Sequence, residues 1–484
     1  MVRNSLTELA SIAFIGRVLG KGFQYGLTVL IARLLGADAL GAFSIGLVVL
    51  SLFGAVSRLG LESAVQRFIP EHIQSEEDGK VLGLILFSLI ASLITGVFFV
   101  VILRNLPNQF VSNFDPLVIG VVEILIIGLP IFSIMRVSEA AARGFKNIEY
   151  SVIIRELSYS GSALMFAALA IYYFEDIYAV AISYVLSILF SAIVGLFLLK
   201  KIGILDNVSS IRIQYKRTLK YSLPLLTASI MTPLIMWSDI LMLGFFVSPT
   251  EVGYYRAAYQ TAILLIFALS TVNSIFPPII SELYHGGNKS KLDTTYTVIT
   301  EWIAIVSIFG SLFVVIFSRQ ILLIFGPEFT AAQLILSILA VARGIEASVG
   351  PAGFLLSMTD NERIEMANTT IIATLNLILN YLFISWYGLT GAAVATSLSL
   401  VLLNILRVVE IKWILGIWPF TRRTLIAIPV ILVCTLPMFI SREVAPGVVS
   451  MLASGAIVSG IVFVILSKVF LFSKQDLILV EKIR

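Results

Sequence analysis

The chain alternates long apolar runs with short polar connections over almost its whole length. Most runs reach the roughly 20 residues that a helix needs to cross the hydrocarbon core of a bilayer. Breaking the chain at polar clusters and at Gly or Pro predicts fourteen helices. They span 8–34, 39–60, 80–103, 116–142, 149–173, 177–200, 217–246, 250–283, 292–317, 328–357, 363–386, 389–415, 423–441 and 447–472. The pattern predicts an all-α integral membrane protein.

Short sequence patterns recur about 212 residues apart. IARLLGADALGAFSIG (31–46) and LGFFVSPTEVGYYRAA (243–258) align Gly41 with Gly253 and Phe43 with Tyr255. Three further pairs follow in order at offsets of 211 to 214, namely 71–80 with 282–291, 144–147 with 358–361, and 172–187 with 385–399. We therefore expect an internal repeat.

The repeat predicts two six-helix lobes, 1–205 and 206–416, followed by a helix pair in 417–484. Because each lobe has an even number of helices, both enter the membrane in the same direction. Such parallel repeats are related by a pseudo-twofold axis along the membrane normal and suit alternating access around a central cavity.

The distribution of positive charge predicts the orientation. The connections on one side are rich in Lys and Arg, whereas the opposite connections hold Arg104, Arg319 and Arg442. This bias predicts a multi-pass protein of the cell membrane with both termini in the cytoplasm. The formal net charge of +4 then reflects orientation and contact with anionic membrane lipids, and no nucleic acid partner is expected.

Residues for soluble chemistry are scarce. The chain has one cysteine and two histidines, so we expect neither a metal site nor a bound cofactor. Walker and nucleophile motifs are not evident, and the outer connections are too short for a catalytic domain. The sequence therefore predicts that the protein is not an enzyme.

Polar residues inside the first predicted helix lie on one face. Arg17, Lys21, Gln24 and Thr28 follow spacings of 4, 3 and 4 residues. Charges inside a membrane span are costly unless they face a cavity or a partner, so this face is a candidate substrate site. The alternative is that Arg17 and Lys21 extend to cytoplasmic lipid head groups.

Three further charged residues are candidates for the same cavity. Arg58 lies near the cytoplasmic end of the second helix, and Asp239 and Arg256 lie on the seventh and eighth. With Arg17, Lys21 and Gln24 they form a predominantly cationic lining, which favours an anionic substrate such as a phosphate. Alternatively, Arg58 pairs with Glu62 at the interface, or Asp239 pairs with Arg256 to close an outer gate.

The remaining buried charges predict structural pairs or an ion site. Glu123 and Glu301 have no adjacent cation in sequence, so either could bind a coupling proton or sodium ion. The other charges come in neighbouring pairs that would lock helices together, namely Arg136 with Glu139, Arg343 with Glu346, Arg155 with Glu156, and Arg407 with Glu410.

Four motifs carry a resemblance to a known family. They are IARLLGADALGAFSIG (31–46), SDILMLGFFVSPTEVGYYRAA (238–258), ARGFKN (142–147) and YGLTGAAVATSLS (387–399). In this order, and with this helix count, the chain resembles the polysaccharide exporters of the multidrug/oligosaccharidyl-lipid/polysaccharide (MOP) superfamily, which include Wzx-type flippases. The resemblance covers essentially the whole chain.

The resemblance implies a flippase for an oligosaccharide linked to a polyisoprenyl phosphate or diphosphate, acting in polysaccharide or glycan biosynthesis. It also implies that the cationic cavity, here Arg17, Lys21, Arg58 and Arg256, handles the phosphate and sugar. Two alternatives remain open: a cation-coupled multidrug antiporter of the same superfamily, and a membrane glycosyltransferase or polymerase.

Overall fold

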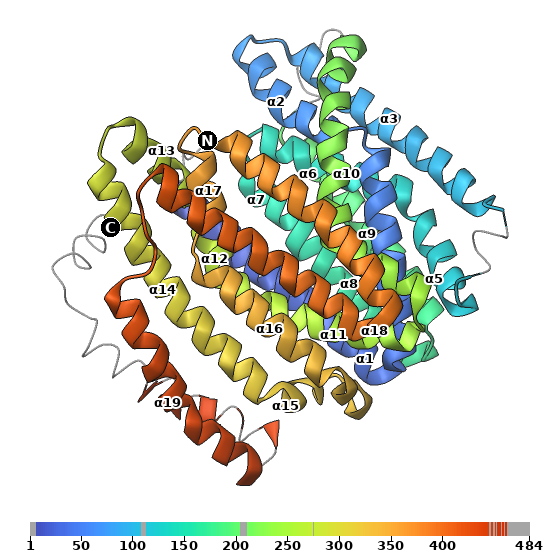
Figure 1. The fold of residues 1–484 in the computed structure, drawn as a ribbon. Helices are drawn as coiled ribbons and strands as arrows, with labels where there is room; N and C mark the ends of the chain where they lie inside the picture. The colour runs from blue at the N-terminus through green and yellow to red at the C-terminus, as the bar shows by residue number, and fades with distance from the viewer. Residues whose placement is uncertain are drawn as a thin grey trace. The chain divides into compact units, whose positions relative to one another are not determined.

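A computed structural model describes residues 6–107, 113–203, 211–273 and 275–444, with scattered positions between 447 and 461. Every regular element among these residues is a helix (Figure 1). The helices up to residue 262 are α1 (Leu6–Ser57), α2 (Leu61–Gln74), α3 (Asp78–Arg104), α5 (Pro116–Ile127), α6 (Leu129–Gly144), α7 (Ile148–Val152), η1 (Ile153–Gly161), α8 (Ser162–Phe174), α9 (Ile177–Lys201), α10 (Tyr215–Phe246) and α11 (Pro249–Ala262). They are followed by η2 (Ile263–Ile266), α12 (Phe267–Val272), α13 (Phe276–His285), α14 (Lys289–Ile316), α15 (Ser318–Leu322), η3 (Pro327–Ala332), α16 (Gln333–Ser348), α17 (Ala352–Ser357), α18 (Glu362–Ile414) and α19 (Arg422–Val444).

The all-α membrane class is confirmed. Among the described residues, nine helices are long and apolar enough to cross a membrane, or up to eleven if each of two bent pairs is one span. α1 and α18 each contain two predicted helices, joined at Gly36 (φ 88°) and Gly388 (φ 54°). Glycine reaches these positive φ values without a Cβ clash. The fourteenth predicted helix, 447–472, falls largely outside the described residues, so the count of fourteen stays a prediction.

Proline explains the two bent spans. α5 and α6 meet at an angle of 49°, with Pro130 at the start of α6. The two parts of α10 meet at 57°, and Pro233 lies between them. A proline inside a helix removes one backbone hydrogen bond and its ring displaces the preceding turn, so a bend follows.

The chain divides into two compact units, Met1–Arg256 and Ala257–Arg484. In the first, α2, α3, α6 and the end of α9 share a core that includes Val65, Val81 and Val137. In the second, α14 and α16 run side by side (Figure 1), and Tyr296 and Ile411 belong to its main core. The predicted lobe boundaries, 1–205, 206–416 and 417–484, stay a prediction.

The helix boundaries repeat as the sequence does. The starts of α3 and α14 are 211 residues apart, and those of α7 and α18 are 214 apart. The break at Gly36 and the gap at Ser248 between α10 and α11 are 212 apart. The repeat is not exact, because η1 is a nine-residue π-helix whereas α18 is α-helical over the corresponding stretch.

Candidate functional site

The predicted polar face of α1 is present and presents two exposed cations. Arg17 and Lys21 are exposed, Gln24 is half-buried and Thr28 is buried. Lys21 Nζ donates to Gln24 Oε1 at 3.4 Å, and Thr28 Oγ1 donates to the Gln24 carbonyl at 2.9 Å. The face therefore combines positive charge with an amide and a hydroxyl, the groups that recognise a phosphate and a sugar.

Two glycines next to this face let another element approach α1 closely. A Cβ at Gly16 would lie 2.2 Å from Val152 Cγ1, and a Cβ at Gly20 would lie 1.8 Å from Glu156 Oε2. Both distances are far below van der Waals contact, so neither position accommodates alanine without displacement. Small residues four apart are a general device for close helix packing in membranes. As a result, the Glu156 carboxylate lies against α1 at Gly20, the residue before Lys21.

The π-helix η1 supplies the residues that face this part of α1. Gln24 Nε2 donates to Ser160 Oγ at 3.3 Å, and Ser160 Oγ donates to the Arg155 carbonyl five residues earlier. The charges of Arg155 and Glu156 both act on Lys21. π-Helical turns are rare and occur often at functional sites. The predicted pair of Arg155 and Glu156 is present at 3.8 Å, and the structure also brings the Glu156 carboxylate against α1.

A buried carboxylate anchors Arg155 from the other side. Glu139 on α6 is 1% exposed and lies within ion-pair distance of Arg136 (2.5 Å), Arg143 (2.6 Å) and Arg155 (3.6 Å). The predicted pair of Arg136 and Glu139 is therefore confirmed, but it belongs to a larger network. With Arg58, Glu62 and Glu156, which pair with these residues, the network holds four arginines and three glutamates and therefore one excess positive charge.

Arg58 is buried and lies in the same network, and its role in a substrate cavity stays a prediction. Its Nε lies 2.5 Å from Glu62 Oε1, which also lies 3.3 Å from Arg136 Nε. The guanidinium lies 5.4 Å from the Phe132 ring centroid. Within the described part of the chain, Arg58 Nη1 is buried and has no hydrogen-bond acceptor. The predicted Arg58–Glu62 pair is thus present, and α6 connects it to Glu139.

Asp239 and Arg256 are placed by aromatic neighbours. Asp239 is 4% exposed, and its Oδ2 accepts a hydrogen bond from Tyr255 at 2.6 Å. The Arg256 guanidinium lies 4.8 Å from the Trp237 ring centroid, a favourable cation–π position. The Arg256 charge also acts on Lys21. Arg256 therefore extends the positive field of the α1 face from α11.

The two hairpins that the repeat relates contact each other through residues that occupy equivalent positions in the two copies. A Cβ at Gly41 would lie 1.8 Å from the Pro249 carbonyl oxygen, and a Cβ at Gly253 would lie 2.1 Å from that of Ala37. Asp38 and Thr250, which are 212 residues apart, are hydrogen-bonded. The aligned Phe43 and Tyr255 are both buried. Residues related by the repeat can touch each other only near its axis, so these glycines mark the axis between the hairpins.

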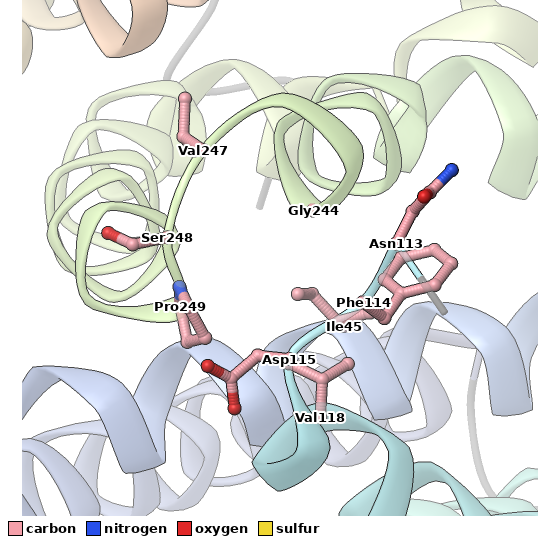
Figure 2. A pocket seen from close by; sticks show the side chains of 9 residues that line it. All are labelled: Ile45, Asn113, Phe114, Asp115, Val118, Gly244, Val247, Ser248 and Pro249. Atoms are coloured by element: carbon pink, nitrogen blue, oxygen red, sulfur yellow. The ribbon is translucent and has the colours of Figure 1, made fainter. Parts of the chain in front are cut away.

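A pocket of about 310 Å³ lies at the turn of the second hairpin (Figure 2). It is bordered by Ile45 of α1, by Asp115 and Val118 at the start of α5, and by Gly244 and Ser248. The Asp115 side chain accepts a hydrogen bond from Leu117 N, which caps α5. None of the predicted site residues lines this pocket, so it is separate from the charged face.

The two predicted coupling residues differ in burial. Glu123 on α5 is exposed, and Glu301 on α14 is 7% exposed. A role in ion coupling stays a prediction for both. Among the described residues, no group of three or more His, Cys, Asp or Glu side chains is arranged to hold a metal ion.

One predicted pairing is wrong. Arg407 was expected to pair with Glu410, but it pairs with Glu365, whose Oε2 lies 3.0 Å from Arg407 Nε. Glu410 instead accepts a hydrogen bond from Asn368 at 2.5 Å. The reason is that Gly388 folds α18 back on itself, which brings its first half alongside its second. The predicted pair of Arg343 and Glu346 is present at 2.7 Å.

The family described as "Polysaccharide biosynthesis protein" matches residues 6–283, more than half of the chain. The chain belongs to this family. The match covers every predicted cavity residue, from Arg17 to Arg256. Membership therefore applies to the part of the molecule that carries the charged face of α1.

Relatives and solved structures match most of the chain. The chain is 27% identical over 402 residues to "Probable low-salt glycan biosynthesis flippase Agl15" of Haloferax volcanii, covering 80% of this chain and 79% of that one. A structure of "Lipid II flippase MurJ, inward closed conformation" matches with a TM-score of 0.72 at 16% identity, covering 96% of this chain and all of that one. An inward-facing MATE family transporter of the MOP superfamily matches with a TM-score of 0.68 at 17% identity, covering 81% and 94%. At these identities the two structures show the fold.

Sequence reasoning named Arg155 and Glu156 as a pair but missed that η1 places residues against the polar face of α1. The sequence did carry a signal for them. The repeat offset is 214 at 144–147 but 212 at 172–187, so the first copy has two extra residues between these positions. A π-helix has more residues per turn than an α-helix, and η1 lies within this interval. The change of offset within this interval is therefore the sequence signal of the element that brings Arg155 and Glu156 to α1.

Proposed function

We propose that this chain is a flippase that moves a lipid-linked oligosaccharide from the inner to the outer leaflet in polysaccharide or glycan biosynthesis. The observation that carries the proposal is the exposed cationic face of α1 in a member of the polysaccharide biosynthesis family. The Haloferax volcanii relative is itself named a probable glycan biosynthesis flippase, which supports the same substrate class.

The charged face suits the head group of such a lipid. Arg17 and Lys21 bind the phosphate or diphosphate, with Arg256 and Arg155 adding to the positive field. Arginine contacts phosphate through two parallel N–H bonds, and its charge does not depend on pH in the physiological range. Gln24 supplies an amide that can hydrogen-bond a sugar hydroxyl. The polyisoprenyl chain stays in the bilayer while the head group moves by alternating access.

The orientation of the chain follows from its basic connections. Both termini and the connection at Lys146 face the cytoplasm of a cell membrane, and the connection at Arg319 faces outward. A coupling proton or sodium ion binds at Glu123 or Glu301. Replacing Cys434 by serine gives a cysteine-free background, in which single cysteines at 146 and 319 should react with an impermeant thiol reagent from opposite sides.

Substrate movement can be tested in reconstituted vesicles that contain a fluorescent polyisoprenyl-diphosphate oligosaccharide. We expect Arg17→Ala and Lys21→Ala each to slow flipping by about tenfold or more, because each removes a charge from the phosphate contact. Arg319→Ala, which removes an exposed cation far along the sequence, is the control. Wild-type rates in both α1 variants, with normal folding, would exclude this face as the substrate site.

A fluorescent cationic drug in the same vesicles tests the antiporter alternative. A positively charged drug would be repelled by the α1 face, so we expect no transport that depends on Arg17 or Lys21. Drug transport by the wild type without flipping of the lipid-linked oligosaccharide would overturn the proposed function.

A further inference from the structure

Glu156 brings an acidic side chain to the cationic face of α1. Its carboxylate lies at the space that Gly20 leaves, one residue before Lys21 and three residues after Arg17. Its side chain is 13% exposed. A negative charge at this point opposes the binding of an anionic head group, so its placement in a phosphate-binding site requires an explanation.

The carboxylate is held more loosely than its acidic neighbours. Glu62 and Glu139 each lie 2.5 Å from an arginine nitrogen. By contrast, the ion-pair distance from Glu156 Oε1 to Arg155 Nε is 3.8 Å, which is beyond hydrogen-bond range. Glu156 thus stabilises the cations around it through charge rather than through a fixed bond. A carboxylate held in this way can be displaced by a stronger anion.

The surrounding charges favour such a resident anion. The charges of Arg17, Lys21 and Arg155 all act on Glu156, and Arg256 acts on Lys21. Several cations that share a partly dehydrated site repel one another and would hold a diphosphate tightly. A transporter needs a site that binds strongly enough to load and weakly enough to release.

We propose that Glu156 is the internal counter-anion of the head-group site: it neutralises Lys21 and its neighbours before substrate binds, yields to the phosphate, and then competes with it to promote release. This inference rests on the proposed function. Glu156 thus sets the affinity of the site for the head group. Gly20 has no side chain, which leaves the space that the Glu156 carboxylate occupies.

Binding and flipping by a Glu156→Gln variant test the proposal. Purified protein in detergent is titrated with farnesyl diphosphate and, separately, with inorganic diphosphate. We expect the variant to bind farnesyl diphosphate on the order of tenfold more tightly, because one opposing charge is gone. Flipping in vesicles should become slower at saturating substrate, since release is impaired. Inorganic diphosphate lacks the lipid chain, so a gain in affinity for both probes would show that Glu156 acts on the diphosphate group, as the proposal requires.

Glu175→Gln is the matched control, because it removes an exposed carboxylate at the far end of α8. Glu156→Asp is a second variant that keeps the charge but withdraws it from the Gly20 space, and it should bind slightly more tightly than the wild type. Unchanged or weaker binding of farnesyl diphosphate by Glu156→Gln would overturn the inference while the proposed function stands. Absence of flipping by the wild type would instead overturn the proposed function.

Discussion

Two hairpins occupy equivalent places in the repeat and use their charges differently. The first spans α7, η1, α8 and α9, residues 148–201, and the second is α18, residues 362–414. They differ in length by one residue, and each reverses direction near its middle, at Asp176 and at Gly388. What differs is the set of bonds that joins the two halves of each hairpin.

The first hairpin is joined by hydroxyl groups. Ser191 Oγ donates to the Ile154 carbonyl at 2.6 Å, and the hydroxyls of Tyr159 and Tyr184 are hydrogen-bonded. The second hairpin is joined by charged and amide groups, since Arg407 pairs with Glu365 and Asn368 donates to Glu410. The second hairpin therefore uses its charges internally, whereas the first leaves Arg155 and Glu156 to contact other helices.

This difference indicates different roles for the charged residues of the two hairpins. In the first copy, η1 turns its charged residues toward α1 and toward Glu139 of α6. In the second copy, the corresponding helix is α-helical, and its acidic residue Glu365 is already paired. We infer that charge-changing substitutions in the first hairpin alter head-group binding and that those in the second alter stability. The predictions below test this division.

The largest effect is expected for Glu139→Gln. This carboxylate is 1% exposed and balances Arg136, Arg143 and Arg155, so its loss leaves buried positive charge without compensation. Breaking a buried pair in this way costs about 3–5 kcal/mol. The midpoint of thermal unfolding in detergent should fall sharply, and Arg155 should lose its anchor.

Glu346→Gln is the control for this change, because Glu346 is more exposed (19%) and, among the described residues, forms an ion pair with one arginine, Arg343. It should reduce stability less than Glu139→Gln does. Equal losses of stability in the two variants would contradict the view that Glu139 is the centre of a network.

Arg407→Ala should destabilise the protein by roughly 1–3 kcal/mol, because the pair with Glu365 is only partly buried. Its affinity for farnesyl diphosphate should not change. Arg155→Ala should show the reverse pattern, with weaker binding and a smaller loss of stability, since the Arg155 side chain is 47% exposed. Isothermal titration and thermal unfolding of the two variants separate these outcomes, and a loss of affinity in Arg407→Ala would break the comparison.

Much of the fold and part of the candidate site can be predicted from the sequence, and the features that cannot be predicted have physical causes. The apolar runs, the hairpin at Gly36 and the polar face of Arg17 and Lys21 depend on local composition and helical spacing, which are visible in the chain. The partners of Arg407 and Arg155 depend on how helices cross after folding. Pairing Arg407 with its sequence neighbour Glu410 was therefore wrong, because the reversal at Gly388 brings Glu365, 42 positions earlier, into contact with Arg407.

Tyr184→Phe and Asn376→Ala form a matched pair of smaller changes. The first removes the hydroxyl bonded to Tyr159 in the first hairpin, and the second removes the amide that donates to Ser399 Oγ at 3.2 Å in the second. Tyr184→Phe removes the partner of Tyr159, whereas Asn376→Ala also removes the acceptor of Asn380, whose Nδ2 donates to Asn376 Oδ1 at 3.0 Å. Each change should reduce stability by about 1–2 kcal/mol, with Asn376→Ala toward the upper end. Thermal unfolding of these variants is compared with that of Arg407→Ala. A loss of stability in Arg407→Ala no larger than in Tyr184→Phe or Asn376→Ala would contradict the view that an ion pair joins the second hairpin.

The smallest effect is expected at an exposed pair outside both hairpins. Arg217 Nη2 donates to Glu71 Oε1 at 2.5 Å, and this hydrogen bond lowers the pKa of the Glu71 carboxyl below its ordinary value. The stabilisation is present above the pKa of the unfolded carboxyl, about 4.3, and is lost as the pH falls through the lower folded-state pKa. Both side chains are more than 40% exposed, so Arg217→Ala should cost less than about 1 kcal/mol at neutral pH. A difference from the wild type that persists at a pH below the pKa of Glu71 would show that Arg217 acts through packing on Phe68, 4.7 Å from its guanidinium, rather than through charge. The loss of stability in Arg217→Ala therefore gives the value of a solvent-exposed ion pair. The amount by which the losses in Glu139→Gln and Arg407→Ala exceed it measures the contribution of burial.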